Sequence, residues 1–209
     1  PKDEGLDTYL MEATVLSDSE IIIRYEQMKS TSESTEEQVV DENSDYVESE
    51  LKFAKIDKDG KSTELKLKLD EDVNNNNVSN FKQADNGDIF CVIENGIVQL
   101  DGKTLEEKNK YEVTDWVDSY LLIGNELIIV NYEEIVSYDI ETGKEKGNLE
   151  ELEKETIKTT GAYYPRIVNS NSKEKIYYRS VLGLYEYDIN SKKSKQIVDG
   201  GISTFGSSN

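Results

Sequence analysis

The 209-residue sequence contains no histidine and a single cysteine, Cys91. Histidine is the commonest general base and the commonest zinc ligand, so its absence removes the usual routes to acid–base and zinc chemistry. One cysteine excludes an internal disulfide, a Cys-pair metal site and a redox dithiol. Cys91 lies in the apolar run Ile89–Ile93, which predicts a buried, inert thiol.

Motifs for nucleophilic and nucleotide chemistry are also missing. The sequence has no Gly-x-Ser-x-Gly elbow and no glycine-rich phosphate loop. Paired carboxylates that could act on glycosides need a defined separation in a cleft, and no segment predicts one. We therefore predict that the chain is not an enzyme, with no catalytic, cofactor-binding or metal-binding residues, and with the ligand-binding residues unknown.

Positive charge is scarce, because 24 Lys and Arg face 44 Asp and Glu for a net charge of −20. Such a field repels phosphate backbones and anionic lipid surfaces, so nucleic acid is not an expected partner. Cations or basic surfaces could be attracted, although acidic residues also serve solubility alone. No apolar run approaches the about 18–20 residues of a membrane helix, so no membrane insertion is predicted. No signal peptide is present, which leaves secretion open.

What the sequence does contain is a repeat. Each copy has an apolar strand, a short turn, a second strand that ends in an apolar residue and Asp, a polar turn and a Lys-rich strand. The repeated aspartates are Asp57, Asp101, Asp139 and Asp188, at intervals of 44, 38 and 49 residues. A further strand-like segment precedes each copy, at 9–16, 78–83, 117–123 and 162–168. The spacing is that of four-stranded propeller blades, which run to about 40–50 residues.

The fold class predicted is therefore all-β, a β-propeller-like run of about four four-stranded antiparallel blades that need not close a ring. The blade limits predicted are 8–72, 73–115, 116–158 and 159–200, with 201–209 as the start of a further blade and 28–50 as an acidic loop insertion. Runs apolar on both faces, such as Ile21–Ile23, are typical of central strands between neighbouring blades.

Local patterns refine this scheme. Asn95-Gly96 predicts a hairpin whose two central residues have positive φ. The alternation Leu65-Lys66-Leu67-Lys68-Leu69 predicts an outermost strand with a Lys face that blocks edge pairing. Asn148, followed three residues later by Glu151, predicts an N-cap with a capping box and a short helix between the third and fourth blades.

The pattern of an apolar residue, Tyr-Asp-Ile, and then Gly or Lys after an apolar hairpin resembles blades of bacterial propellers of the quinoprotein and YVTN-like kind. The copies that carry it are 127–146, 176–198, 89–103 and, with its insertion, 21–61. The chain also resembles the N-terminal propeller-type domain of clostridial extracellular solute-binding lipoproteins. The resemblance covers most of the chain, but it brings no quinone-binding or WD-type residues, so no family active site is carried over.

Four further features have a functional and a plain interpretation. Asp57-Lys58-Asp59-Gly60 starts like a calcium loop, but positions six and twelve are Ser62 and Lys68, so a polar turn is favoured. The 28–50 insertion could be a partner-binding or cation-attracting flap, but a solvated loop is favoured, and the polar connector at 70–77 is likewise favoured as a plain loop.

The aromatic residues are the other two features. The tyrosines Tyr163, Tyr164, Tyr177, Tyr178, Tyr185 and Tyr187 could stack on a sugar, but strand packing is favoured. Trp116 is predicted to be an anchor between blades.

We expect a non-enzymatic ligand- or protein-binding or scaffold domain of a secreted or surface-anchored bacterial protein, with an unknown protein or carbohydrate as partner. The alternatives are an accessory fragment of a larger extracellular hydrolase whose catalytic residues lie outside this chain, and a structural spacer. Abundant Lys, Asn, Ile and Glu are typical of Gram-positive proteins of low GC content. Any ligand surface is expected on the face that carries 28–50, Asn74–Asn77 and 147–158.

Overall fold

The computed structural model describes residues 6–16, 19–29, 49–69, 73, 77–131, 134–160, 166–168, 174–180 and 182–200. Most of the predicted insertion 28–50, the residues Asn74–Asn76 and the predicted further blade at 201–209 lie outside the described residues. The limits predicted between blades stay predictions.

The chain folds into four antiparallel sheets of four strands, each in sequential order. We call them blades 1 to 4. Blade 1 contains β1 (Leu6–Val15), β2 (Ile21–Lys29), β3 (Ser49–Ile56) and β4 (Ser62–Leu65). Blade 2 contains β5 (Ser79–Gln83), β6 (Ile89–Ile93), β7 (Gly96–Leu100) and β8 (Glu107–Glu112). Blade 3 contains β9 (Val117–Ile123), β10 (Glu126–Asn131), β11 (Ile135–Asp139) and β12 (Glu145–Asn148). Blade 4 contains β13 (Arg166–Val168), β14 (Lys175–Ser180), β15 (Gly183–Asp188) and β16 (Lys193–Asp199).

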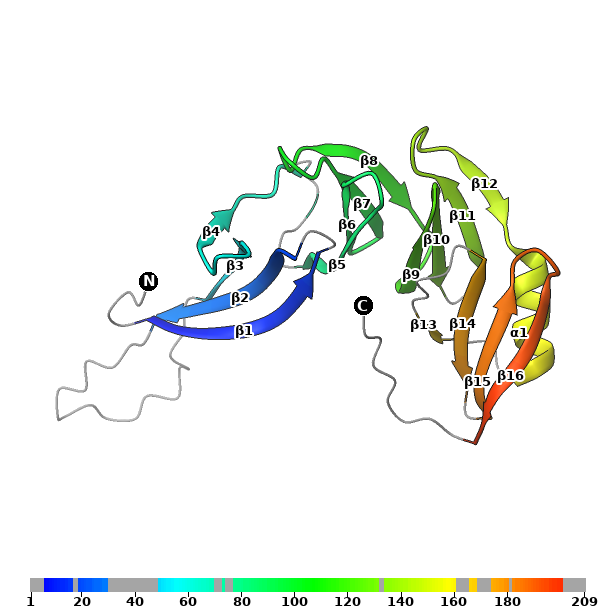
Figure 1. Ribbon diagram of the computed structural model, residues 1–209. Coiled ribbons are helices and arrows are strands. Elements are labelled where there is room, and N and C mark those ends of the chain that lie inside the picture. Colours follow the sequence, from blue (N-terminus) through cyan, green and yellow to red (C-terminus); the bar gives the residue numbers. More distant parts are fainter. Residues whose placement is uncertain are drawn as a thin grey trace, which may run out of the picture.

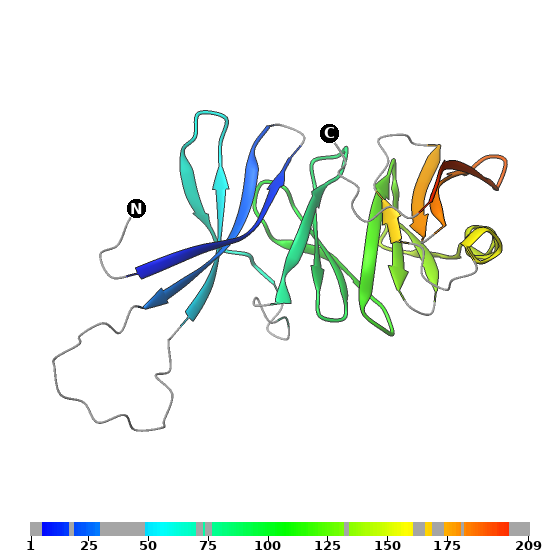
Figure 2. The ribbon, with the colours of Figure 1, turned by 90° about the horizontal axis from the view of Figure 1, so that it is seen from below.

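The four blades follow one another in an open arc, and they are not closed into a ring (Figure 1, Figure 2). Their first strands lie against one another, because β1 contacts β5 and β9 contacts β13. The predicted fold class, with four-stranded antiparallel blades in an incomplete ring, is confirmed.

Apolar side chains between the blades hold the arc together. The two faces of β10 show how this works: Leu127 and Ile129 belong to the core shared with blade 2. Ile128 and Val130 belong to the core shared with blade 4. Successive strand residues point to opposite faces, so a central strand apolar at every position can bury both.

The predicted Lys-faced outer strand at 65–69 is wrong, because β4 ends at Leu65. Beyond it, Leu67 and Leu69 pack half-buried against the core between blades 1 and 2. The backbone of Lys68 instead joins blade 2: its N–H donates to Leu105 O at 3.3 Å, and its carbonyl accepts from Glu107 N–H at 3.3 Å. The leucines gain more from burial between two blades than from a place on an exposed sheet edge.

The predicted helix is present as α1 (Glu150–Thr160), but its predicted N-cap is wrong. Asn148 pairs with Val136 in the sheet, and Leu149 precedes the first helical residue. The Leu149 N–H donates to Ile135 O at 2.7 Å, which anchors this end of the helix to blade 3. The first turn contains three acidic residues, Glu150, Glu151 and Glu153. Their negative charges interact favourably with the positive N-terminal end of the helix dipole. No described helix has the length and apolar character needed to cross a membrane.

The predicted hairpin at Asn95-Gly96 forms with its turn one residue earlier. Ile93 pairs with Gly96, so Glu94 and Asn95 are the central residues, and neither has positive φ. Gly96 has φ 150°, and a Cβ there would lie 2.0 Å from Tyr111 O. Gly183, the first residue of β15, has φ 148°, and a Cβ on it would lie 2.0 Å from Val198 O. The glycines are required because the fourth strand of the blade crosses so close.

Candidate binding face and internal polar groups

The repeated aspartates occupy the same place in each blade, at the end of the third strand. The Asp101 carboxylate accepts the N–H groups of Lys103 and Thr104, both at 2.9 Å. Asp139 accepts from Thr142 N–H at 2.9 Å and from the Thr142 hydroxyl at 2.9 Å. These backbone donors hold the pKa of the Asp101 and Asp139 carboxyls below the usual range. The repeated aspartate is therefore a turn-forming device.

Asp57 and Asp188 serve the same purpose in blades 1 and 4. Asp57 accepts from Lys61 N–H at 2.8 Å and Asp188 from Ser191 N–H at 2.6 Å. In the described part of the chain, no group of three or more His, Cys, Asp and Glu residues is placed to hold a metal ion.

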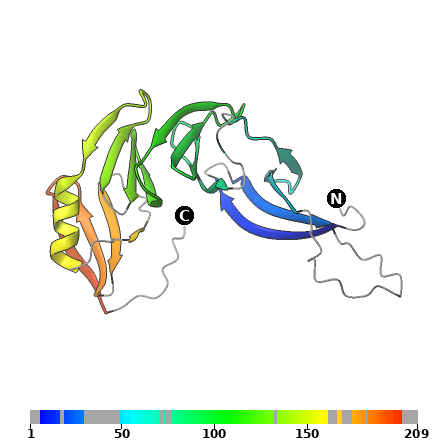
Figure 3. The same cartoon turned by 180° about the vertical axis from the view of Figure 1, so that it is seen from behind.

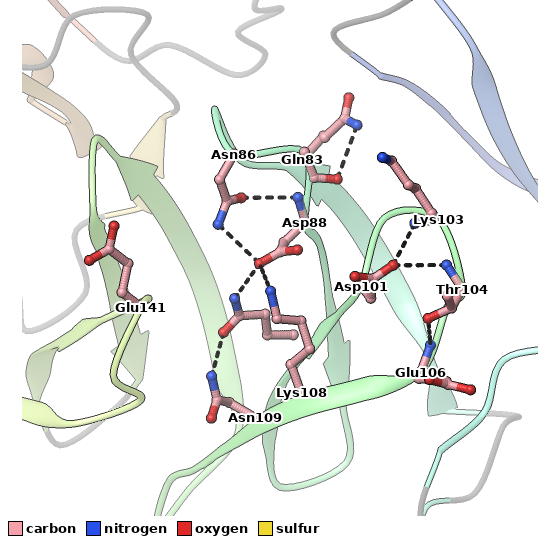
Figure 4. Close-up of polar contacts among 12 residues, drawn as sticks. Gln83, Asn86, Asp88, Asp101, Lys103, Thr104, Glu106, Lys108, Asn109 and Glu141 are labelled. Atoms are coloured by element: carbon pink, nitrogen blue, oxygen red, sulfur yellow. Dashed lines mark hydrogen bonds and ion pairs between the residues drawn. The ribbon is translucent and has the colours of Figure 1, made fainter.

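Blade 2 contains a buried carboxylate, Asp88, at the turn before β6 (Figure 4). Its Oδ2 accepts from Gln99 Nε2 at 2.6 Å, Lys108 Nζ at 2.7 Å and Asn86 Nδ2 at 3.0 Å. The Asp88 side chain is 7% exposed, whereas that of Lys108 is 42% exposed. A buried carboxylate is tolerable only when paired and hydrogen-bonded, and Asp88 meets both conditions.

Gln99 extends this network into the core of blade 2. Its Oε1 accepts from Tyr111 Oη at 2.7 Å and from Asn109 Nδ2 at 2.8 Å. Burial raises the pKa of Tyr111 to about 12, so the phenol stays protonated as a donor. The network positions no activated nucleophile, and its contacts are those of a structural cluster that ties the turn before β6 to β7 and β8.

A second polar chain links the first strands of blades 1 to 3. The Glu12 carboxylate on β1 accepts from Asn80 N–H at 2.9 Å and Phe81 N–H at 3.3 Å on β5. Tyr120 on β9 donates its hydroxyl to Asn80 O at 2.6 Å. Asn80 has φ 52° and lies where the β5–β6 register shifts, so the bonds from both sides fix an irregular stretch of backbone.

Lys82 on β5 completes this chain. Its Nζ donates to Tyr120 O at 2.5 Å and lies 4.4 Å from the centre of the Tyr120 ring. Burial lowers the pKa of Lys82 to about 8 and raises that of Tyr120 well above its ordinary value. Neither this lysine nor the Asp88 network was singled out from the sequence, because both depend on contacts between residues far apart in the chain.

Trp116 is not the predicted anchor between blades, because it is 81% exposed. It lies in the connection from β8 to β9, where Asp115 Oδ1 accepts the Trp116 N–H at 2.8 Å. Val113 in the same connection donates to Asn95 O at 3.2 Å, which places it beside the β6–β7 turn. In a four-stranded meander, the second-to-third turns and the blade-to-blade connections lie at the same end. We call this end the crossover face, and it is the face on which the sequence predicts any ligand surface.

The other predicted residues are placed as follows. Tyr178, Tyr185 and Tyr187 are buried in the core between blades 3 and 4, and the Tyr178 and Tyr185 rings stack at 5.2 Å. Tyr163 and Tyr164 lie outside the described residues. Asn77 donates its Nδ2 to Glu94 Oε2 at 3.1 Å on the crossover face. Helix α1 contacts β11 and β16 and buries Leu152, so this part of 147–158 serves packing.

No family model and no curated protein matches the sequence. Solved structures do match the fold. An extracellular domain of a putative one component system from B. thetaiotaomicron aligns with TM-score 0.53 and 17% identity over 94% of this chain and 22% of that chain. PorZ, a bacterial surface component of the type-IX secretion system of Porphyromonas gingivalis, aligns with TM-score 0.55 and 11% identity over 94% of this chain and 30% of that chain.

The β-propeller domain of Cps50 (Swd1) from Myceliophteria thermophila aligns with TM-score 0.50 and 15% identity over 73% of this chain and 51% of that chain. The fold is that of a β-propeller. This propeller chain spans between about a fifth and a half of the length of these three structures. At such identities the likeness concerns the fold alone.

Proposed function

We propose that this propeller chain is a non-enzymatic binding or scaffold domain that engages a protein or carbohydrate partner through the crossover face around Trp116. The observation that carries the proposal is the 81% exposure of the Trp116 side chain. Tryptophan is enriched among the central residues that contribute most of the binding energy at interfaces, and its ring also stacks on sugars. The bond from Trp116 N–H to Asp115 fixes the turn that presents the ring.

The internal polar groups support a binding role over catalysis. Asp88, Gln99 and Lys82 are each engaged by partners from other strands, and each of these contacts links separate strands or turns. A secreted or surface-anchored setting is supported by the extracellular and surface proteins among the structures of similar fold. The hydrolase-fragment alternative has no specific observation in its favour and stays a prediction.

The test uses the only tryptophan in the chain as its own reporter. The 209-residue protein is screened on a glycan array and against immobilised peptides, and hits are titrated by Trp116 fluorescence. Binding at the crossover face is expected to shift the emission to the blue, since the ring leaves water. Trp116→Phe has no tryptophan left to report binding, so wild type and variant are compared by isothermal titration calorimetry, and the variant should weaken each hit by at least about tenfold, as loss of a central aromatic contact does.

Ile197→Ala is the matched control, because Ile197 is also exposed, at 47%, but lies on β16. A hit that binds wild type and Trp116→Phe equally would place the binding surface elsewhere and contradict the proposal. A well-folded sample with no hit in either screen would count against a binding domain for these two partner classes.

A further inference from the structure

The crossover face of blades 2 and 3 has an excess of negative charge. Neither Lys nor Arg occurs between Lys110 and Lys144, a stretch that includes the β8–β9 connection with Trp116 and the β10–β11 turn. The carboxylates that the structure describes at this end of the two blades belong to Glu94, Asp115, Asp118 and Glu134. Trp116 therefore shares its end of the blades with several acidic residues.

The opposite end of the same blades has both signs of charge. Lys108 Nζ lies 2.7 Å from Asp88 Oδ2, and Lys146 forms an ion pair with Glu126. Paired charges of opposite sign largely cancel at a distance, so these pairs add little to the field around the molecule.

The carboxylates that flank Trp116 are not cancelled in this way. Among the residues that the structure describes, neither Asp115 nor Asp118 forms an ion pair. The nearest lysine in the sequence, Lys110, lies 3.4 Å from Glu112 instead. Asp115 Oδ1 accepts the Trp116 N–H at 2.8 Å, so one carboxylate is held beside the backbone that presents the ring.

This part of the crossover face lies in the middle of the arc. The β8–β9 connection joins blades 2 and 3, with blade 1 on one side and blade 4 on the other (Figure 1, Figure 3). Blades pack through the flat faces of their sheets, as the two faces of β10 do. A further blade at either end of the arc would lie beside blade 1 or blade 4, and it would not cover Trp116.

Resting on the proposed function, which makes Trp116 the centre of a binding surface, we propose that the partner is a protein segment rich in lysine and arginine. A cation over an aromatic face is attracted by the ring, and tryptophan is the best of the aromatic residues for this contact. Asp115 and Asp118, on either side of Trp116 in the sequence, supply counter-charges for neighbouring cations of the same segment. The negative field also speeds the arrival of a basic partner.

A carbohydrate fits this surface less well. A field of one sign attracts only a partner of net opposite charge, so a neutral sugar gains nothing from it at a distance and an acidic sugar is repelled. A bare metal ion also fits poorly, because in the described ranges of the chain no three His, Cys, Asp or Glu residues are placed to hold one. A basic segment instead brings several cations to separate carboxylates.

The experiment titrates the 209-residue protein by isothermal titration calorimetry. The probes are three peptides of equal length that alternate serine with lysine, glutamine or glutamate, and a neutral cello-oligosaccharide. Only the lysine peptide is expected to bind. Its dissociation constant should rise at least about tenfold between about 0.01 M and about 0.15 M salt, because the screening length falls from about 30 Å to about 8 Å.

Two double variants locate the binding surface, because each removes two negative charges. Asp115→Asn with Asp118→Asn acts beside Trp116, and asparagine keeps an oxygen that can accept the Trp116 N–H. Asp59→Asn with Glu141→Gln is the matched control, because both residues are exposed in turns between third and fourth strands, at the opposite end of the blades. The first should bind the lysine peptide at least about fivefold more weakly, and the control within about twofold of wild type.

Trp116→Leu removes the aromatic face but keeps an apolar side chain. It should also weaken the lysine peptide at least about fivefold, since the contact between cation and ring is lost. Circular dichroism and thermal unfolding check that each variant is folded.

Equal binding of the lysine peptide by the two double variants would mean that net charge alone attracts it, and this result overturns the proposal. A wild type that does not bind the lysine peptide, or a Trp116→Leu variant that binds it as tightly as wild type does, overturns it as well. The proposed function survives each of these results if the glutamine peptide or the cello-oligosaccharide binds wild type and Trp116→Phe weakens that binding.

Discussion

Lys82 on β5 and Tyr120 on β9 are linked twice, through the Lys82 Nζ bond to Tyr120 O and through the position of Nζ 4.4 Å above the Tyr120 ring. The two residues belong to the first strands of blades 2 and 3, which are 38 residues apart in sequence. A cation over an aromatic face is attractive, but the loss of water around the ammonium opposes it. The pKa of Lys82, lowered to about 8 by burial, shows that desolvation dominates.

The stability of the protein should therefore rise with pH between about 8 and 10. Below pH 8 the folded and unfolded states both hold the Lys82 proton, and the folded state carries the cost of the buried charge. Between the folded value of about 8 and the ordinary value of 10.5, the unfolded chain binds more protons. Linkage then predicts a gain of about 2 kcal/mol in the free energy of unfolding from pH 8 to pH 10.

The variant Lys82→Met should lose this pH-dependent gain, because it has no amine to titrate. Urea unfolding of both proteins at pH 7, 8, 9 and 10 measures the difference. Above about pH 10 the buried tyrosines Tyr111 and Tyr120, with raised pKa values, should lower the stability of both proteins alike. Parallel stability curves for wild type and Lys82→Met up to pH 10 would show that the lysine is solvated.

Removing the Glu12 carboxylate should loosen blade 1 from blade 2. Glu12→Ala leaves the Asn80 and Phe81 N–H groups without their acceptor, and we expect a loss of about 1–3 kcal/mol. Equilibrium unfolding measures the loss, and hydrogen exchange should show faster exchange at Asn80 and Phe81 specifically. Glu141→Ala, at an exposed turn, is the control and should change stability by less than about 0.5 kcal/mol.

Asp88→Ala should destabilise blade 2 by about 2–4 kcal/mol, because it leaves the buried Gln99 amide without its acceptor. The comparison is Asp118→Ala, an exposed carboxylate on β9. Thermal unfolding of both variants gives the difference. If the two variants had equal melting temperatures, water would replace the hydrogen bonds of Asp88, and the network would add nothing to stability.

Lys192 has φ 55° in the turn after Asp188, a conformation that costs a non-glycine residue about 1 kcal/mol. Gly60 and Gly143 hold the corresponding left-handed positions in blades 1 and 3. Lys192→Gly should therefore stabilise the protein by at most about 0.5 kcal/mol, because the chain entropy that glycine adds to the unfolded state offsets much of the relieved strain.

Leu105, with φ 58°, is the informative control for this turn. Its side chain packs against the core between blades 1 and 2, so Leu105→Gly should destabilise, since lost burial outweighs relieved strain. A destabilised Lys192→Gly in urea unfolding would show that the lysine side chain contributes more than its backbone costs.

The repeat pattern of the sequence alone determined the architecture. Two-faced apolar strands need a sheet on each side, and an aspartate at the end of each third strand supplies the donors of the next turn with an acceptor. Both are local properties, read from residues within a few positions of one another. That is why Asp101 and Asp139 could be placed in equivalent turns, and why the four antiparallel blades could be predicted.

Only the tertiary structure decided which polar and aromatic side chains face water and which face another blade. The bonds of Glu12 to Asn80 and of Lys82 to Tyr120 span 68 and 38 residues, and no local pattern encodes them. Trp116 is exposed for the same reason: a tryptophan fits an interface between blades or a binding face equally well. The outcome depends on the path of the connection that carries it, which contacts between distant strands fix.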